Sequence, residues 1–528
     1  MKTLKVLDVT LRDGGCVNDF NFGTPYMEKI LTAQEAADID IIELGYLDEQ
    51  KGSESGRTQY VDEKVIPNSI LKSKKPGTSY VVMMDYGKFD ADRLQPRTKE
   101  GIDGIRLAFH KKNCRDMVAI GRKILDKGYD FYVQPMITLR YTDRELIDLI
   151  DIVNAELPDA SGFYIVDTFG EMRPNDMNRI LYLVDNNLNP DITLGFHSHN
   201  NLQMSYSNAI SLLQFPTNRN LMLDSSIMGM GKGAGNLNTE LLLEHLNLFY
   251  GKKYKIDPLL EVIDKVINQI HSEVYWGYSP EYYLSSTNHC TPSYASHFYN
   301  KHMLPIDQVS ELLGMISEDK KISFDKNYAE DLYRNYNESK IVDDEAVVND
   351  FKALLKGKRV LLIAPGKSIG THKEKITSVC NQNDVISIGL NLTQEYATDY
   401  ILTTRKDVYD QAVNNNQNVI VVSSVSKGGR GNVRVLNYKK WIEVDERTHD
   451  SSSVIALNFL HACGVVEILL AGFDGFSSNI NDNYYDYEMR RPVTEDQANS
   501  RNEYYKRFIN SIRNKGIKIE FLTRSKYE

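Results

Sequence analysis

Eight apolar, β-rich runs recur between helical stretches up to residue 227, and this repeat constrains the fold more than any other feature. Each run is almost continuously apolar, as expected of a strand that is buried on both faces. Amphipathic stretches such as DRELIDLIDIVNAEL separate several of them. The runs are LKVLDVT, IDIIELGY, SYVVMMDY, IDGIRLAF, DFYVQPMI, GFYIVDTF, TLGFHSHN and NLMLDSSI. Eight β/α units within about 250 residues predict an α/β fold, a (β/α)8 TIM barrel, in preference to a doubly wound open sheet.

Polar side chains stand at or near the carboxyl ends of these runs. They are Arg12, Asp13, Glu43, Asp85, Arg106, Gln134, Asp167, His197 and His199. A closed barrel brings these ends together at one mouth, which is where active sites of such folds lie. We therefore interpret Glu43, Arg106, Gln134 and Asp167 as candidate substrate-binding residues.

The motif HSHNN at 197–201 is the most informative local pattern. Side chains alternate along a strand, so His197 and His199 point the same way and can bind one metal ion. Two histidines can equally be structural at a polar barrel end. Asp13 supplies a third ligand from the neighbouring part of a closed barrel, which favours a metal. Two histidines and one carboxylate suit a divalent cation, with Mn²⁺ expected and Mg²⁺, Co²⁺ or Zn²⁺ as alternatives.

The loop GMGKGAGN at 229–236 formally fits a dinucleotide-binding fingerprint. It follows the eighth strand and leads out of the repeat, whereas the fingerprint should open a βαβ unit. We expect Gly231 and Gly233 to let the backbone approach an anionic substrate, or to pack tightly around the metal. Lys232 and Asn236 are the side chains that could contribute there.

Composition narrows the class of partners. The net charge of −10 and the pI near 5.7 argue against nucleic acid and anionic membrane surfaces, which need clustered Lys and Arg. No window approaches the roughly 18 apolar residues of a membrane span, and no signal peptide is evident. The five cysteines form no CxxC pair, so we expect reduced thiols and a cytoplasmic protein.

The remainder of the chain reads differently from the barrel. We predict three parts: a barrel over 1–285, a helical appendage and linker over 286–350, and a Rossmann-like α/β domain over 351–528. The last begins with KRVLLIAPGKSIG and continues through further parallel strands. APGKS is not a P-loop, because Leu361 occupies the position where that motif requires glycine. The glycine turn after the first strand could still hold a phosphate.

Three motifs together, LDVTLRDGG, the strand ending GFHSHNN and the loop GMGKGAGN, resemble the DRE-TIM metallolyases, the HMG-CoA lyase-like superfamily. Over residues 3–300 the chain looks most similar to the 4-hydroxy-2-oxovalerate aldolases. The resemblance implies a lyase that makes or breaks a C–C bond of a 2-oxo acid with an aldehyde or sugar. It also implies a divalent metal on Asp13, His197 and His199, with Asn236 near it, and an enolate stabilised by Arg12.

The proton carrier is where this sequence departs from the family. The related aldolases have a catalytic histidine three residues beyond the metal aspartate, and Cys16 occupies that position here. A small thiol at this place can be purely structural. His110, Tyr275 and His289 are alternative proton carriers.

The C-terminal strands LLIAPGKSI, SIGLNLT and EILLAGFDG, with SSSVIALNFLHACG, are similar to Rossmann-like bacterial sialyltransferase folds. This resemblance implies a nucleotide-sugar site, with candidate contacts at Gly366, Ser368, Asn391, Ser452 and Ser453, and Asp474 as a ligand or a helix cap. Three hypotheses follow: an aldolase, a glycosyltransferase-like protein with an accessory barrel, and a metal-binding scaffold. The fusion hints at a sugar acid of surface-polysaccharide synthesis, and a homo-oligomer stays open.

Overall fold

The chain forms two compact units, residues 1–295 and residues 296–528. The computed structural model describes residues 3–528 apart from 51–53, 68–70, 72–73, 302–303, 393–394, 427, 429–430, 444–449 and 486–492.

The first unit is a closed barrel of parallel strands, which confirms the predicted fold class. All eight predicted runs are strands: β1 (Leu4–Asp8), β2 (Ile41–Leu47), β4 (Ser79–Asp85), β5 (Gly104–Phe109), β6 (Asp130–Pro135), β7 (Gly162–Asp167), β8 (Thr193–Ser198) and β9 (Leu221–Ser225). They pair in the order β1-β9-β8-β7-β6-β5-β4-β2, and pairing of β1 with β2 closes the ring. Because all strands are parallel, their carboxyl ends meet at one mouth.

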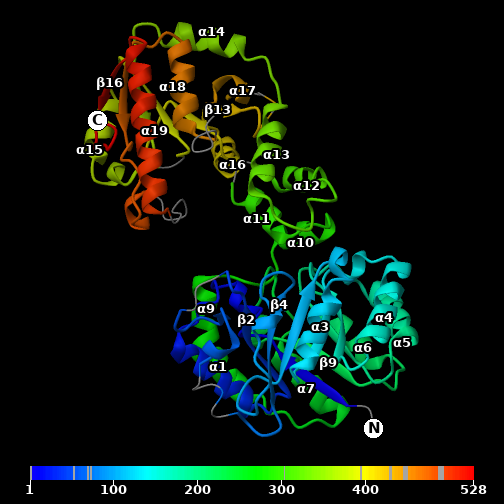
Figure 1. The fold of residues 1–528 in the computed structure, drawn as a ribbon. Coiled ribbons are helices and arrows are strands. Elements are labelled where there is room, and N and C mark those ends of the chain that lie inside the picture. The colour runs from blue at the N-terminus through cyan, green and yellow to red at the C-terminus, as the bar shows by residue number, and fades with distance from the viewer. Residues whose placement is uncertain are drawn as a thin grey trace. The chain divides into compact units, whose positions relative to one another are not determined.

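Helices surround these strands (Figure 1). They are α1 (Thr24–Ala36), α3 (Met117–Asp126), α4 (Asp143–Glu156), α5 (Pro174–Asn187), α6 (Ser205–Gln214) and α7 (Thr239–Tyr250). The amphipathic stretch DRELIDLIDIVNAE forms α4, and Thr142 caps its N-terminus in a capping box with Glu145. A large apolar core lies between strands and helices, and a smaller cluster that includes Leu7, Val81 and Tyr164 forms a separate core.

One irregularity in β2 was not predicted. The pairing of β2 with β4 shifts register between Glu43 and Tyr46, which marks a β-bulge. Beyond it, a two-residue strand, β3 (Gln59–Tyr60), pairs with the end of β2. Gly45 permits this pairing of β3 with β2, since its φ is +148° and a Cβ at this position would lie 2.0 Å from the carbonyl oxygen of Thr58. The bulge thus moves the end of β2 and adds β3 to the mouth.

The helices that follow the barrel divide between the two units. In the first unit are α8 (Asp257–Val262), a π-helical turn (Ile263–Ile267), α9 (Asn268–Glu273) and α10 (Pro280–Thr287), and α11 (Pro292–Tyr299) crosses the boundary. The second unit begins with α12 (Ile306–Gly314), α13 (Lys326–Glu338) and α14 (Glu345–Leu354).

The predicted boundaries at 285 and 350 therefore differ from the observed division. Helices α13 and α14 and their connection contact the C-terminal sheet region, where Asp344 accepts from Asn437 N at 2.9 Å and Tyr333 donates to Asp450 at 3.3 Å. These contacts attach residues 296–350 to the second unit, so this segment is not a separate linker.

The second unit contains an open parallel sheet in the order β14-β13-β12-β11-β10-β15-β16. Its strands are β10 (Arg359–Ile363), β11 (Val385–Leu390), β12 (Tyr400–Thr403), β13 (Val419–Val422), β14 (Val433–Leu436), β15 (Glu467–Ala471) and β16 (Lys518–Phe521). Its helices are α15 (Lys373–Cys380), α16 (Lys406–Asn414), α17 (Tyr438–Trp441), α18 (Ser452–Ala462) and α19 (Glu495–Asn514). Strands run outward in both directions from β10, so the order changes direction beside β15, as at the switch point of a Rossmann-like sheet.

Among the described residues, no helix is both long enough and apolar enough to cross a bilayer.

Candidate active site

The polar turn after β1 places two charged side chains at the barrel mouth. The backbone N–H groups of Arg12 and Asp13 both donate to the carbonyl of Val9, at 3.0 and 2.8 Å, so the chain turns sharply as it leaves the strand. Arg12 then donates from Nη1 to Asp13 Oδ1 and from Nε to Glu43 Oε2, each at 2.7 Å. The turn thereby holds a carboxylate and a guanidinium side by side in a buried position.

Asp13 lies beside the histidine pair from β8. Ligand atoms of Asp13, His197 and His199 all fall within 4.8 Å of one another, and all three residues are buried. The two imidazole rings lie 5.4 Å apart at their centroids and nearly perpendicular, at 86°. This geometry can hold one metal ion between three protein ligands.

The glycine-rich loop after β9 closes over Asp13. Asn236 donates from Nδ2 to Asp13 Oδ2 at 2.8 Å, while its own Oδ1 is buried without a hydrogen-bond partner. Gly231 makes this approach feasible, since a Cβ there would lie 2.2 Å from Asn236 Nδ2 and 2.6 Å from Asp13 Oδ2. Gly233, with φ +69°, lies against Asn201 in the same way. The loop therefore packs around the candidate metal centre.

The protonation states of these groups suit a cation. Burial alone would raise the pKa of Asp13, but the nearby charges of His199 and Arg12 outweigh it and hold that pKa well below its usual value. Burial lowers the pKa of His199 to about 4. A carboxylate and a neutral imidazole are the forms that bind metal. His199 Nδ1 and Asn236 Oδ1 are buried without hydrogen-bond partners, so the donor set fits a divalent ion.

A buried network of ion pairs contacts the candidate metal centre. His197 Nδ1 lies 3.0 Å from Asp224 Oδ2, which leaves Nε2 free to bind metal when Nδ1 carries the proton. Arg106 pairs with Asp224 and lies 2.9 Å from Glu43 Oε2 through Nη1. Glu43 in turn accepts from Arg12. The network thus connects Arg12 to the candidate metal ligand His197.

A cavity of about 320 Å³ opens above this network. Its lining comes from loops and strand ends around the whole mouth: Arg12, Asp13, Cys16, Phe20, Tyr46, Asp48, Gln59, Met83, Asp85, Ala108, Gln134, Met136, Val166, Thr168, His197, His199 and Lys232. The structure thus brings seven predicted site residues to one cavity: Arg12, Asp13, Cys16, Gln134, His197, His199 and Lys232.

Five predicted substrate contacts do not line this cavity: Glu43, Arg106, Asp167, Gly231 and Gly233. Glu43 and Arg106 are wholly buried in the ionic network, so we correct their assignment from substrate contact to support of Arg12 and His197. Asp167 accepts from the backbone N–H groups of Glu171 and Met172, at 2.9 and 3.1 Å. Burial raises its pKa to about 7. Asp167 therefore shapes the loop after β7.

The candidate proton carriers occupy different surroundings. Cys16 lines the cavity, and desolvation at the mouth together with the Asp13 charge raises the pKa of its thiol to about 12. His110 lies outside the lining, and burial lowers its pKa. Tyr275 is 58% exposed and donates to a backbone carbonyl.

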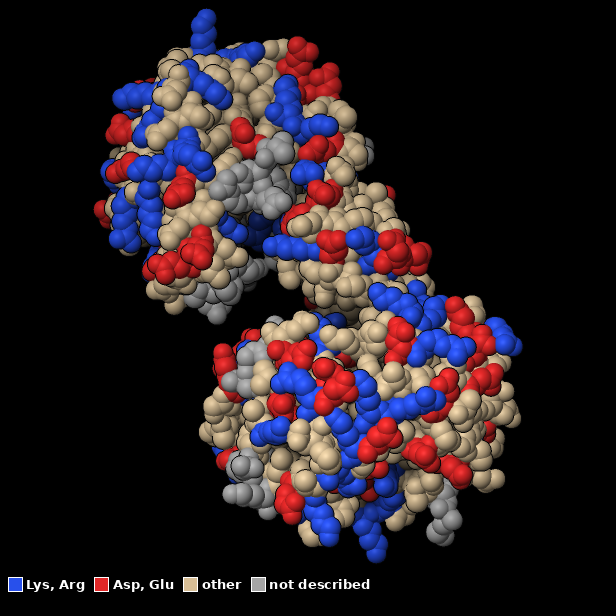
Figure 2. Space-filling view, in the orientation of Figure 1, with Lys and Arg blue, Asp and Glu red and all other residues tan. Residues whose placement is uncertain are grey.

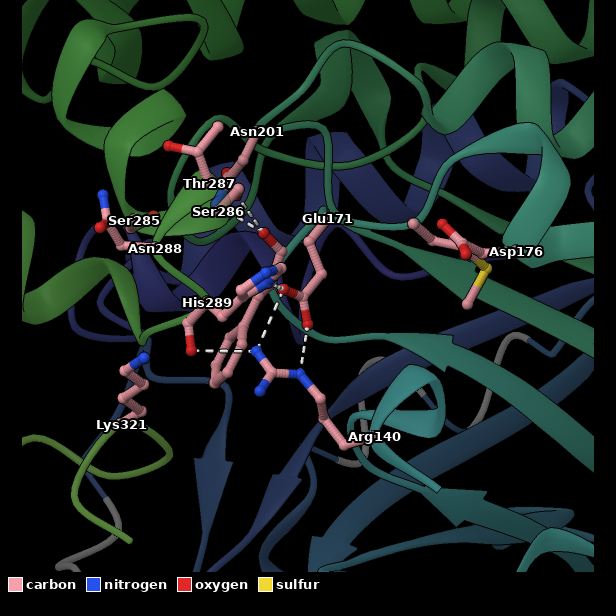
Figure 3. A network of polar contacts seen from close by, with 12 residues as sticks. Arg140, Glu171, Asp176, Asn201, Ser285, Ser286, Thr287, Asn288, His289 and Lys321 are labelled. Carbon is pink, nitrogen blue, oxygen red and sulfur yellow. Dashed lines mark hydrogen bonds and ion pairs between the residues drawn. The ribbon is translucent and has the colours of Figure 1, made fainter. Parts of the chain in front are cut away.

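His289 lies in a polar network outside the cavity lining (Figure 3). Its Nδ1 is 2.6 Å from Oε2 of the buried Glu171. Arg140 holds the same carboxylate through Nε and Nη2, at 2.9 and 3.1 Å, and donates to the His289 carbonyl at 3.0 Å. His289 adopts a left-handed φ of +60°. Its ring is therefore oriented by a carboxylate, which sequence reasoning did not predict.

Four residues of the site escaped prediction from sequence. Asp224 stands in the apolar run NLMLDSSI, where it resembled a strand residue of no special role. Tyr46, Asp48 and Gln59 follow the bulge in β2, and no periodic pattern marks them. Of these, only Asp224 left a usable signal, a carboxylate at the end of a barrel strand.

The second unit has its own cavity, of about 210 Å³, at the carboxyl ends of its strands beside the switch point. Of the predicted nucleotide contacts, Gly366, Asn391, Ser452 and Ser453 line it. Ser368 does not, and its backbone N–H donates to Asp474 Oδ2 at 2.6 Å. Asp474 thus caps the turn after β10, although it also lines the cavity.

Surface charge follows the mixed composition. Figure 2 shows Lys and Arg interspersed with Asp and Glu over the drawn face of the first unit.

Comparisons with known proteins concern the barrel. The HMGL-like family model matches residues 105–263. The 4-hydroxy-2-oxovalerate aldolase 2 of Comamonas testosteroni is 29% identical over 247 residues, which cover 46% of this chain and 68% of that protein. The 4-hydroxy-2-oxovalerate aldolase of Pseudoalteromonas translucida is 26% identical over 295 residues, which cover 53% of this chain and 83% of that protein.

Among solved structures, the N-terminal domain of a candidate aldolase from Bacteroides vulgatus is similar, with 24% identity and a TM-score of 0.47. The match covers 56% of this chain and 96% of that domain. The matched residues include the motifs on β8 and in the loop after β9, whereas the motif that follows β1 lies outside them. Residues 105–263, within the barrel, are thus similar to the HMGL-like family.

Proposed function

We propose that the barrel is a divalent-metal-dependent aldolase or lyase that makes or breaks a C–C bond of a 2-oxo acid. The observation that carries this proposal is the convergence of Asp13, His197 and His199 beside Arg12 in one cavity. The named relatives are aldolases of a 2-oxo acid, which supports the same class. Mn²⁺ is the proposed metal, because two imidazoles and one carboxylate suit it better than Mg²⁺.

A metal held by these three residues would supply Lewis-acid chemistry toward the oxygens of the 2-oxo acid. Asn236 Oδ1 is buried without a hydrogen-bond partner and is available as a further ligand. The protein's own contribution is to keep these donors oriented before substrate arrives.

Arg12 is the proposed stabiliser of developing negative charge. Its Nε and Nη1 are held by Glu43 and Asp13, whereas Nη2 is buried and has no hydrogen-bond partner. Despite burial, the charges of Glu43 and Asp13 raise its pKa, so it stays a cation. A fixed cation with one free donor suits the former keto oxygen of an enolate.

Two residues remain as proton carriers. Cys16 is exposed and lines the cavity, where desolvation and the Asp13 charge raise the pKa of its thiol and so favour the protonated form over a base. His289 is oriented by Glu171 and serves as the alternative carrier. We therefore propose that Cys16 fills space or donates a proton.

Exchange of the pyruvate methyl protons for deuterium tests this function without knowledge of the aldehyde. In D₂O with Mn²⁺, the protein should catalyse exchange, because an enolate forms reversibly even when no acceptor is present. Arg12→Ala should slow exchange by about 10² or more, the scale of a lost oxyanion donor. Arg179→Ala, which removes an arginine paired with Asp143 on the surface, is the matched control and should keep the full rate. Absence of exchange at full metal occupancy would refute the proposal.

A nucleotide-binding role for the second unit is a second candidate. Its support is the cavity at the switch point, lined by Gly366, Asn391, Ser452 and Ser453 with aromatic side chains such as Tyr505. Backbone N–H groups at the start of α18 could meet a phosphate there. Titration of the full chain with CMP and UDP by calorimetry tests it, and no heat at millimolar nucleotide would exclude it.

A further inference from the structure

The cavity of the barrel has two chemically distinct sides. The metal triad and Arg12 come from β1 and β8, with Lys232 from the loop after β9. In the closed order of strands, β4 lies four strands from β8 in either direction, and so stands across the barrel. β4 thus lies opposite β8, whereas β2 pairs with β1. None of the cavity-lining side chains from β2, β3 and β4 is a candidate metal ligand, so they are available to the second substrate.

Four of the cavity-lining residues on or next to these strands are polar, and we call them the β2–β4 arc: Tyr46, Asp48, Gln59 and Asp85. Asp48 is 4% exposed and accepts from Gln50 N through Oδ1 at 2.9 Å, which leaves Oδ2 for a ligand. Burial and the neighbouring Asp85 carboxylate raise the pKa of the Tyr46 hydroxyl well above its usual value, so it stays protonated. The arc is thus rich in oxygen acceptors that require donors from a ligand.

Gln59 adds an amide to the arc. The residue is only 7% exposed and lines the cavity. An amide at a cavity wall can both donate to and accept from the hydroxyl groups of a ligand. The short strand β3 pairs with the end of β2, and it delivers Gln59 to this position.

The arc also lacks positive charge. Arg12 and Lys232 are the cationic side chains among the described residues that line the cavity, and neither comes from β2, β3 or β4. With Asp48 and Asp85 on the arc, a phosphate or carboxylate group would meet like charge. Apolar side chains complete the wall of the cavity and can pack against the C–H groups of a substrate. They are Met83, Ala108, Met136 and Val166.

Size agrees with a substrate larger than a two-carbon aldehyde. The cavity volume of about 320 Å³ corresponds to roughly ten water molecules. A 2-oxo acid such as pyruvate has six heavy atoms, so room remains for a second substrate with several hydroxyl groups.

From these observations we infer that the aldehyde substrate is an uncharged, polyhydroxylated one, a short-chain aldose whose hydroxyl groups bind the β2–β4 arc. This inference rests on the proposed function and specifies its second substrate. In the synthetic direction, C3 of the 2-oxo acid loses one proton and forms a C–C bond to the aldehyde carbon. The aldehyde oxygen takes up one proton and becomes a hydroxyl, so no oxidant or reductant is needed.

Matched pairs of aldehydes test the inference in the Mn²⁺-loaded full chain with pyruvate. D-Glyceraldehyde is compared with propionaldehyde, D-erythrose with butyraldehyde, and D-glyceraldehyde with its 3-phosphate. The kcat/KM for each hydroxylated aldehyde should exceed that of its apolar match by at least about 10-fold, the scale of one hydrogen bond to a charged group. The phosphate should be the poorest of its pair.

Variants separate recognition by the arc from the intrinsic reactivity of hydroxylated aldehydes. Asp48→Asn and Gln59→Leu should each lower the hydroxylated-to-apolar ratio by about 10-fold, since each removes a polar group from the arc. Neither should change the methyl exchange of pyruvate alone. Glu49→Gln is the matched control, because this neighbouring carboxylate pairs with Arg93 outside the cavity and should leave the ratio unchanged.

The outcomes discriminate between the two proposals. Intact pyruvate exchange, with an apolar or phosphorylated aldehyde preferred, would overturn the inference and leave the proposed function standing. The same holds for a ratio that neither variant changes. Loss of exchange in the unaltered protein would overturn the proposed function, and the inference with it. If one variant fails to fold, as judged by its melting curve, the other still decides.

Discussion

Asp224 offers the sharpest test of the network beneath the metal centre, through the substitution Asp224→Asn. The carboxylate accepts from His197 through Oδ2 and pairs with Arg106 through the same oxygen. Asparagine can keep that oxygen in place, but it removes the charge and replaces Oδ1 by an amide nitrogen. Removing a carboxylate that orients a metal-binding histidine typically weakens metal binding by about 10-fold to 10²-fold, or roughly 1.4–2.8 kcal/mol.

The net charge of the buried groups also predicts that Asp224→Asn weakens metal binding. Asp13, Glu43 and Asp224 face Arg12 and Arg106, so the cluster carries one excess negative charge that favours a cation. Asp224→Asn removes that excess. The fold should suffer less than the site, because Arg106 keeps Glu43. The new amide nitrogen would take the place of Oδ1, which has no partner, at a cost of about 1–3 kcal/mol.

Electron paramagnetic resonance of free Mn²⁺ gives the dissociation constant, and urea unfolding gives the stability. His197→Ala is the reference for loss of a ligand and should bind more weakly than Asp224→Asn. Asp116→Asn, an exposed carboxylate outside the cavity lining, is the control and should bind as tightly as the unaltered protein. A dissociation constant of Asp224→Asn within twofold of the original would refute the supporting role. A loss as large as that of His197→Ala would instead indicate a direct ligand.

Two further predictions follow from the mouth of the barrel. Gly231→Ala should weaken Mn²⁺ binding by at least about 10-fold, because the added Cβ would press on Asn236 and Asp13. Unchanged binding in the same resonance titration would contradict the close packing of the loop over Asp13. Asp167 has a pKa raised by burial to about 7 in the folded protein, above its unfolded value, so the folded chain holds a proton that the unfolded chain releases between about pH 4 and 7. Stability should therefore fall as pH rises through that window, by at most about 1.4 kcal/mol per pH unit from this group, and Asp167→Asn should flatten the slope measured by urea unfolding at several pH values.

The barrel could be predicted because its strands are buried on both faces, which leaves continuous apolar runs in the sequence. The proximity of the three candidate metal ligands could be predicted for a related reason. Alternation along β8 puts His197 and His199 on one face, and closure of the barrel brings Asp13 beside them. Both arguments need only the pattern of a single strand and the closure of the sheet.

Other parts carry no such local signal. Strand β3 has two residues, too few for any periodicity, and the bulge in β2 depends on the backbone of Gly45 meeting Thr58. Arg106 looked like a ligand of substrate because the sequence shows its strand but not its two buried partners. The boundary near 295 was missed because an amphipathic helix does not reveal which sheet covers it.

The bulge in β2 separates two kinds of change that this barrel can undergo. The candidate metal ligands and Arg12 are held by β1, β8 and the loop after β9, whereas Asp48 and Gln59 lie past the bulge, after the end of β2 and on β3, outside the ring of eight strands. Residues there can be exchanged without disturbing the hydrogen bonds that close the barrel. Such a segment is a natural point at which descendants, or designers, could exchange one aldehyde for another while the reaction itself persists.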